Sequence, residues 1–121
     1  RMKMELQKMV EYAKALKLED MEWKPLYPNN MPGNGLMGYA AYLELPDGSG
    51  GRHYTILLQH KEDERGCMLE EVELYVLLER VRSGSDSFVR AFRTLDEAKA
   101  RAVLQFQMVY GYAMSYLADD K

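Results

Sequence analysis

The sequence predicts an α+β fold: a single antiparallel sheet of about four strands, flanked by an N-terminal helix and a long C-terminal helix. Apolar residues repeat at helical spacing over residues 2–18 and 95–117, and they alternate at strand spacing between these two segments. Short turn-forming segments separate the alternating stretches, which favours antiparallel pairing of neighbouring strands. One sheet with both helices on the same face is the simplest layered arrangement of these elements.

The first element is an amphipathic helix over residues 2–18, which has to end before Pro25. Its apolar side chains are spaced three or four residues apart, so they lie on one stripe. A loop inside the domain is expected over residues 24–35, because this segment holds three prolines, two glycines and three asparagines. The stripe of the helix consists of Met2, Leu6, Met9, Ala13 and Leu16.

Four alternating stretches predict the strands. Residues 39–45 and 53–60 flank a turn rich in glycine, and residues 88–93 follow a Ser/Gly/Asp turn at 83–87. Residues 69–82 alternate like a strand and also fit a helix, and the turn that follows them favours a strand. A four-residue loop in the last hairpin then predicts these cross-strand pairs: Glu79 with Arg90, Leu77 with Phe92, and Val81 with Phe88.

The C-terminal helix is expected to begin after Thr94 and to run to about Leu117. Thr94 is followed three residues later by Glu97, which is the spacing of a capping box. From residue 103 to residue 117 only four residues are neither apolar nor aromatic, more than one sheet face can cover. The residues expected to form an oligomer or partner interface are Leu104, Met108, Tyr110, Tyr112 and Met114.

The length of 121 residues predicts one domain over residues 1–121, large enough to bury a core without a metal or disulfides. The content of 47% hydrophobic and 29% charged residues excludes a disordered acidic tail and a small disulfide scaffold. Cys67 is the only cysteine, which excludes an intrachain disulfide and favours a cytoplasmic location. No apolar run approaches the roughly 20 residues of a membrane span, so no membrane partner is expected.

No motif in the chain is typical of an enzyme, a metal site or a cofactor site. Residues 33–38 match G-x-G-x-x-G, but the dinucleotide fingerprint needs a preceding strand and a following helix, and here a loop precedes and a strand follows. His53 and His60 fall on opposite faces of one strand and Cys67 lies beyond a charged loop, so four convergent zinc ligands are not expected. We therefore expect a non-catalytic protein without a cofactor.

The charge distribution bears on the choice of partner. Residues 44–79 carry a net charge of −6 and residues 80–101 a net charge of +3, within a total of −3. A basic cluster around the last hairpin suits an anion, a protein partner or a nucleic-acid backbone, although the acidic segment would repel phosphate. The cluster consists of Arg80, Arg82, Arg90 and Arg93.

These features together favour a protein-interaction module that binds a protein partner or itself as a homo-oligomer. Nucleic-acid or nucleotide binding through the arginine cluster is the second hypothesis. Small size, acidic balance and the lack of catalytic motifs also suit an accessory or inhibitor protein of a phage or mobile element that acts on a host protein complex, an expectation by analogy alone.

Overall fold

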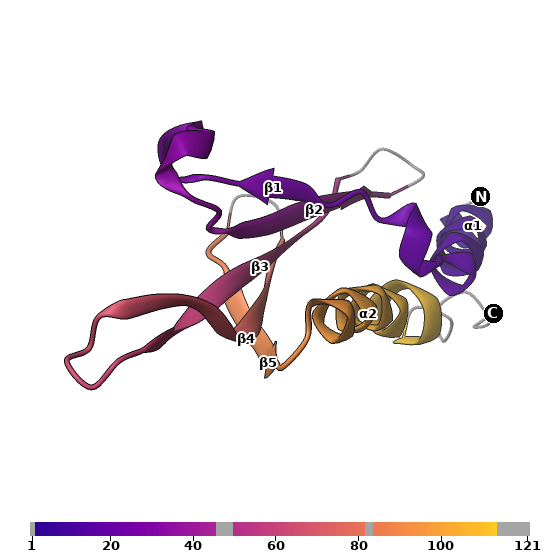
Figure 1. Cartoon of the computed structure of the whole chain (residues 1–121). Coiled ribbons are helices and arrows are strands. Elements are labelled where there is room, and N and C mark those ends of the chain that lie inside the picture. Colours follow the sequence, from indigo (N-terminus) through magenta and orange to yellow (C-terminus); the bar gives the residue numbers. More distant parts are fainter. Residues whose placement is uncertain (1, 46–49, 82–83, 114–121) are drawn as a thin grey trace.

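The computed structural model describes residues 2–45, 50–81 and 84–113, and Figure 1 shows their arrangement. A five-stranded antiparallel sheet in the order β1-β2-β3-β4-β5 is combined with one helix at each end of the chain, which confirms the predicted fold class. The elements are α1 (Met2–Ala15), β1 (Lys24–Leu26), β2 (Gly38–Glu44), β3 (Gly51–Glu62), β4 (Met68–Val81), β5 (Ser87–Phe92), α2 (Leu95–Phe106) and the π-helical η4 (Gln107–Ala113).

The core lies between one face of the sheet and α2, and we call this face the covered face. The register aligns Ala41 of β2, Tyr54 of β3 and Glu79 of β4 in one row, and Ile56 and Leu77 in the next. Helix α2 contacts β3, β4 and β5 through a stripe of buried side chains with small residues in its first half, which lets the helix approach the sheet closely. The buried stripe of α2 consists of Ala98, Ala102, Val103 and Phe106.

Thr94 caps the start of α2 as predicted, although the Glu97 carboxylate accepts from the Thr94 hydroxyl rather than from the Thr94 backbone N–H, as it would in a full capping box. The backbone N–H of Glu97 donates to Thr94 Oγ1 at 3.1 Å, and the Thr94 hydroxyl donates to the Glu97 carboxylate at 2.9 Å. Two acidic residues in the first turn, Asp96 and Glu97, also match the positive end of the helix dipole.

The C-terminal helix departs from the prediction beyond Phe106, where the wider π-helical segment η4 replaces the α-helix. The predicted end at Leu117 lies outside the described residues. Helix α1 also differs, because it ends at Ala15 and is followed by a short 3₁₀ turn at Leu18–Asp20.

Helix α1 packs mainly against η4, beyond the edge of the sheet, so the prediction that both helices share one sheet face is wrong for α1. The side-chain amide of Gln107 donates to the carbonyl oxygens of Lys14 and Leu16, at 3.3 and 3.0 Å. These carbonyls lie at or just beyond the end of α1, where no intrahelical donor is left for them. A Cβ atom at Gly111 would lie 3.1 Å from Lys14 Cγ, so the two helical segments touch closely at this glycine.

The predicted loop 24–35 contains a short edge strand. Lys24–Leu26 pairs with β2, and two 3₁₀ turns at Pro28–Asn30 and Pro32–Asn34 follow it. The turn-forming composition masked this strand, whose proline is tolerated because β1 lies at the edge of the sheet.

The predicted register of the β4–β5 hairpin is wrong. Phe92 lies opposite Tyr75 rather than Leu77, and Arg90 lies opposite Leu77 rather than Glu79. The shift arises at the turn, where Glu79 pairs with Ser87, three residues before the predicted partner Arg90. An irregularity between Leu77 and Leu78 adds one residue to β5 and reduces the shift to two residues at Leu77. The extra residue is Val89, whose side chain packs against the core; Phe88 lies opposite Leu78.

Candidate functional site

The second face of the sheet carries a continuous set of apolar side chains that no described helix covers, and we call it the open face. The register of β2–β5 arranges its residues in three rows across the strands. The first row is Tyr42, His53 and Arg80; the second is Ala40, Thr55, Leu78 and Phe88; the third is Gly38, Leu57, Val76 and Ala91.

Large side chains on the open face are strongly exposed. Phe88 is 66% exposed and Tyr42 is 48% exposed, while Leu57, Val76 and Leu78 between them are half-buried by their neighbours. The second and third rows contain no charged residue. Monomeric proteins rarely expose a contiguous apolar surface of this kind, so its presence indicates a docking site.

The first row gives the open face a polar margin. The rings of Tyr42 and His53 stack with centroids 4.5 Å apart, and His53 lies opposite Arg80. Arg80 Nε is buried and has no hydrogen-bond acceptor among the described residues, since its nearest carboxylate oxygen, on Asp86, is 3.8 Å away. A buried donor without an acceptor is costly, and a partner carboxylate at this margin would satisfy it.

The predicted arginine cluster is not gathered on one face. Arg90 lies opposite the core residue Leu77, whereas Arg80 lies three residues along β4 and therefore on the open face. The guanidinium of Arg90 lies 6.0 Å from the Phe92 ring centroid. Arg93 lies in the bend between β5 and α2, and Arg82 lies outside the described residues.

The residues of the predicted helical interface lie in different environments in the structure. Leu104 and Met108 are 44% and 47% exposed and one turn apart, and Tyr112 is exposed one turn further along. Tyr110, in contrast, faces the fold, where its ring packs on Phe106 with centroids 4.7 Å apart. Met114 lies outside the described residues. Three of the five predicted residues therefore form an exposed stripe, which we call the helix stripe.

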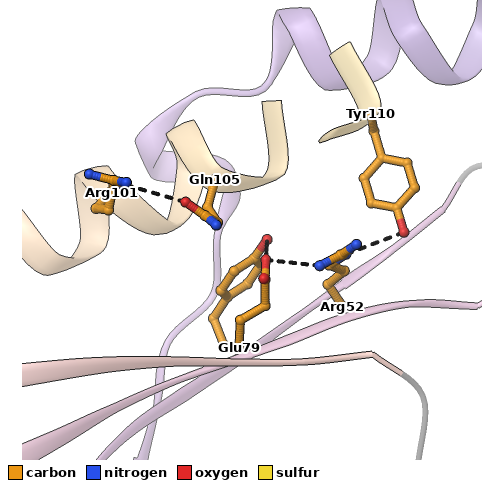
Figure 2. A network of polar contacts seen from close by, with 6 residues as sticks. Arg52, Glu79, Arg101, Gln105 and Tyr110 are labelled. Carbon is orange, nitrogen blue, oxygen red and sulfur yellow. Dashed lines mark hydrogen bonds and ion pairs between the residues drawn. The ribbon is translucent and has the colours of Figure 1, made fainter. Parts of the chain in front are cut away.

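Beneath η4 lies a polar network that the sequence does not reveal, and Figure 2 shows its members. Arg52 and Glu79 form a mostly buried ion pair at 3.1 Å. The Tyr54 hydroxyl donates to the same Glu79 carboxylate at 2.9 Å, and Arg52 Nε donates to the Tyr110 hydroxyl at 3.4 Å. The network ties the sheet to η4 within the core, so its geometry indicates a role in packing.

Burial raises the pKa of the Tyr54 hydroxyl far above its ordinary value, and the negative charge of Glu79 raises it further. The neutral phenol is therefore the form that the fold accommodates, and it remains the hydrogen-bond donor to Glu79. Tyr54 is fully buried, so this donor is closed to an external substrate.

The remaining candidate ligands lie apart from one another. His53 belongs to the open face, while His60 Nδ1 lies 3.0 Å from the carbonyl oxygen of Glu70. Cys67 is exposed in the β3–β4 turn. The glycine-rich segment forms a 3₁₀ turn and then enters β2, as predicted.

The open face is the feature that the sequence prediction missed. Its signal is present in the sequence, since β3 and β4 place Leu57, Val76 and Leu78 on the face opposite the core. A strand with apolar residues on both faces is normally covered on both faces.

Comparison with known protein families, with curated proteins and with solved structures finds no match to this chain. Within the described ranges, no helix is long and apolar enough to cross a membrane.

Proposed function

We propose that this protein is a non-catalytic protein-interaction module and that the open face is its docking surface. The observation that carries the proposal is the uncovered apolar area centred on Leu57, Val76 and Leu78, with the strongly exposed Phe88 beside them. Burial of such side chains yields about 25 cal/mol per Å² of apolar surface, so a complementary apolar partner gains binding energy from the whole face.

The occupant we favour is a second copy of the chain. The second and third rows of two such faces, which contain no charged residue, can pack together at about 10 Å as in a sandwich, with alternating side chains filling the space between them. Each copy also supplies a carboxylate and a guanidinium at the polar margin. Glu44 lies two residues after Tyr42 on the same face of β2, and Arg80 has a buried Nε without a hydrogen-bond acceptor among the described residues. A homodimer can therefore satisfy Arg80 with a carboxylate of the partner copy.

The test is the oligomeric state of Phe88→Glu, measured by analytical ultracentrifugation over a wide range of protein concentrations. We expect the unaltered protein to form dimers and Phe88→Glu to weaken dimerisation at least tenfold, because the variant places a carboxylate in the uncharged part of the face. Since Phe88 is exposed, the variant should keep the fold of the unaltered protein, which circular dichroism measures.

The matched variant is Met108→Glu, which alters the helix stripe instead of the open face. If Met108→Glu dissociates the dimer and Phe88→Glu does not, the predicted helical interface carries the interaction and the open-face proposal is wrong. A monomer at every concentration would contradict self-association and would leave the module with a larger protein as its partner. That the protein is an accessory or inhibitor protein of a phage or mobile element stays a prediction by analogy.

A further inference from the structure

A groove of about 680 Å³ lies on the covered face of the sheet, at the end that α2 does not reach. One wall is the segment that joins β1 to β2, and the other is the far end of the long β3–β4 hairpin, which Figure 1 shows projecting away from the helices. The apolar side chains that line the groove are Leu36, Met37, Leu58, Met68, Leu69 and Val72.

The floor of the groove includes a sheet edge without a strand partner. The ladder between β2 and β3 ends at the pair Gly38–Leu57, and one further bond joins the N–H of Leu58 to the carbonyl oxygen of Met37 at 3.0 Å. Alternation along β3 turns the N–H and C=O of His60 toward the same edge as the N–H of Leu58. Beyond Leu58, β3 pairs with no described strand on this side.

The third feature of the groove is the negative charge of the β3–β4 hairpin end beside it. Residues 61–73, which form the end of the hairpin, contain six acidic and two basic residues, a net charge of −4. One of the two bases, Lys61, is already paired with Glu71 at 2.6 Å, while Glu70 lines the groove itself. A cationic group on a ligand would therefore be attracted to this end of the molecule.

We propose that the groove binds an extended peptide segment of a partner protein, with apolar side chains at alternate positions and a lysine or arginine beside them. The segment adds to β3 as a strand, exchanging backbone hydrogen bonds with His60, while its apolar side chains pack against Leu58, Val72 and the flexible Met68. A small apolar molecule would fill the groove but would leave the His60 backbone groups unpaired, and for this reason a peptide is the better occupant. The site lies on the opposite sheet face from the open face, so it is independent of dimerisation.

The probe is a displayed library of random 12-residue peptides selected on the full chain. We expect the enriched peptides to share alternating apolar residues and at least one basic residue. Synthetic copies should bind with a dissociation constant that rises at least tenfold for Met68→Lys. Met68 is 73% exposed, so this variant should fold normally while it blocks the groove and reduces the net charge of residues 61–73 from −4 to −3.

The matched control is Leu104→Lys, which places the same side chain on the helix stripe and should bind the peptides like the unaltered protein. Two further peptides carry methyl groups on the odd-numbered or on the even-numbered backbone nitrogens, and one of the two should lose binding because its N–H groups toward β3 are blocked. Amide exchange of His60 should slow when the unmethylated peptide is added. Three outcomes overturn the proposal: no peptide is enriched on the unaltered protein relative to the Met68→Lys protein, binding is lost in Phe88→Glu instead, or both methylated peptides bind unchanged.

Discussion

At the scale of single residues, Thr94 shows how local sequence determines where an element begins. Its hydroxyl oxygen accepts the N–H of Glu97, one of the amides that has no partner within the first turn of α2. We expect Thr94→Ala to lower the free energy of unfolding by about 1 kcal/mol. Urea denaturation followed by circular dichroism measures this loss, and Thr94→Ser, which keeps the oxygen, serves as the control.

Tyr54 leads to a prediction about pH. The pKa of Tyr54 is raised in the folded protein by burial and by Glu79, whereas the unfolded chain titrates near the ordinary value of 10.0. Above pH 10 the unfolded state therefore loses a proton that the folded state keeps, and stability falls by about 1.4 kcal/mol per pH unit from this residue. Below pH 10 the contribution is fully present.

The variant Tyr54→Phe removes both the titration and the hydrogen bond to Glu79. At pH 8 we expect it to be less stable than the unaltered protein by about 1.5 kcal/mol, the value of a hydrogen bond to a charged group. By about pH 11 the difference should vanish, because only the unaltered protein is destabilised by this titration. Urea denaturation at both pH values measures the two differences, and a constant difference would contradict the raised pKa.

At the scale of elements, the sequence predicts which helices and strands exist better than it predicts where they end and how the strands pair. Helical spacing and the Thr94–Glu97 spacing locate the start of α2 correctly, because both depend on neighbouring residues, whereas neither predicts the change to a π-helix after Phe106. The strand pairing in the last hairpin depends on the turn, which sets Glu79 opposite Ser87, and on Val89, which leaves the ladder and packs against the core. Local alternation indicates neither feature. The position of α1 against η4 rests on contacts between distant residues such as Lys14 and Gln107.

Gly111 is the element-scale test of that packing. A Cβ atom there would already lie 3.1 Å from Lys14 Cγ and 3.7 Å from Ala13 Cβ, so a larger side chain forces α1 away from η4. We expect Gly111→Leu to lower the free energy of unfolding by about 2 kcal/mol, the cost of overpacking. Faster amide exchange confined to α1 would locate the damage, and an unchanged exchange rate would contradict the close packing.

At the scale of the whole molecule, charge and apolar surface decide between classes of partner. The net charge of −3 and the separation of Arg80 from Arg90 on opposite sheet faces both weaken the case for nucleic acid. The protein-interaction module is a hypothesis from the charge distribution, the lack of catalytic motifs and the apolar C-terminal helix. Its candidate surface could not be located until the register showed which apolar residues the helices leave uncovered.

We expect only weak binding to a 20-nucleotide single-stranded DNA, with a dissociation constant of about 100 μM or more at physiological salt, the weak end of the range for non-specific contacts. Fluorescence anisotropy at several salt concentrations measures it. Submicromolar binding that is lost in a triple variant of Arg80, Arg82 and Arg90 to alanine would reverse the ranking of the two functions.

The pairing of α1 with η4 also has a consequence for the order in which the chain acquires its structure during synthesis. Lys14 and the Gln107 side chain that binds its carbonyl are 93 residues apart. At translation rates of about 5–20 residues per second, α1 waits roughly 5–20 s for its partner to be made. Through that interval the strands can pair as they emerge, while the face of α1 that packs against η4 has no partner. Of the two described α-helices, α1 is therefore made before α2 yet reaches its final position only once η4 has been synthesised.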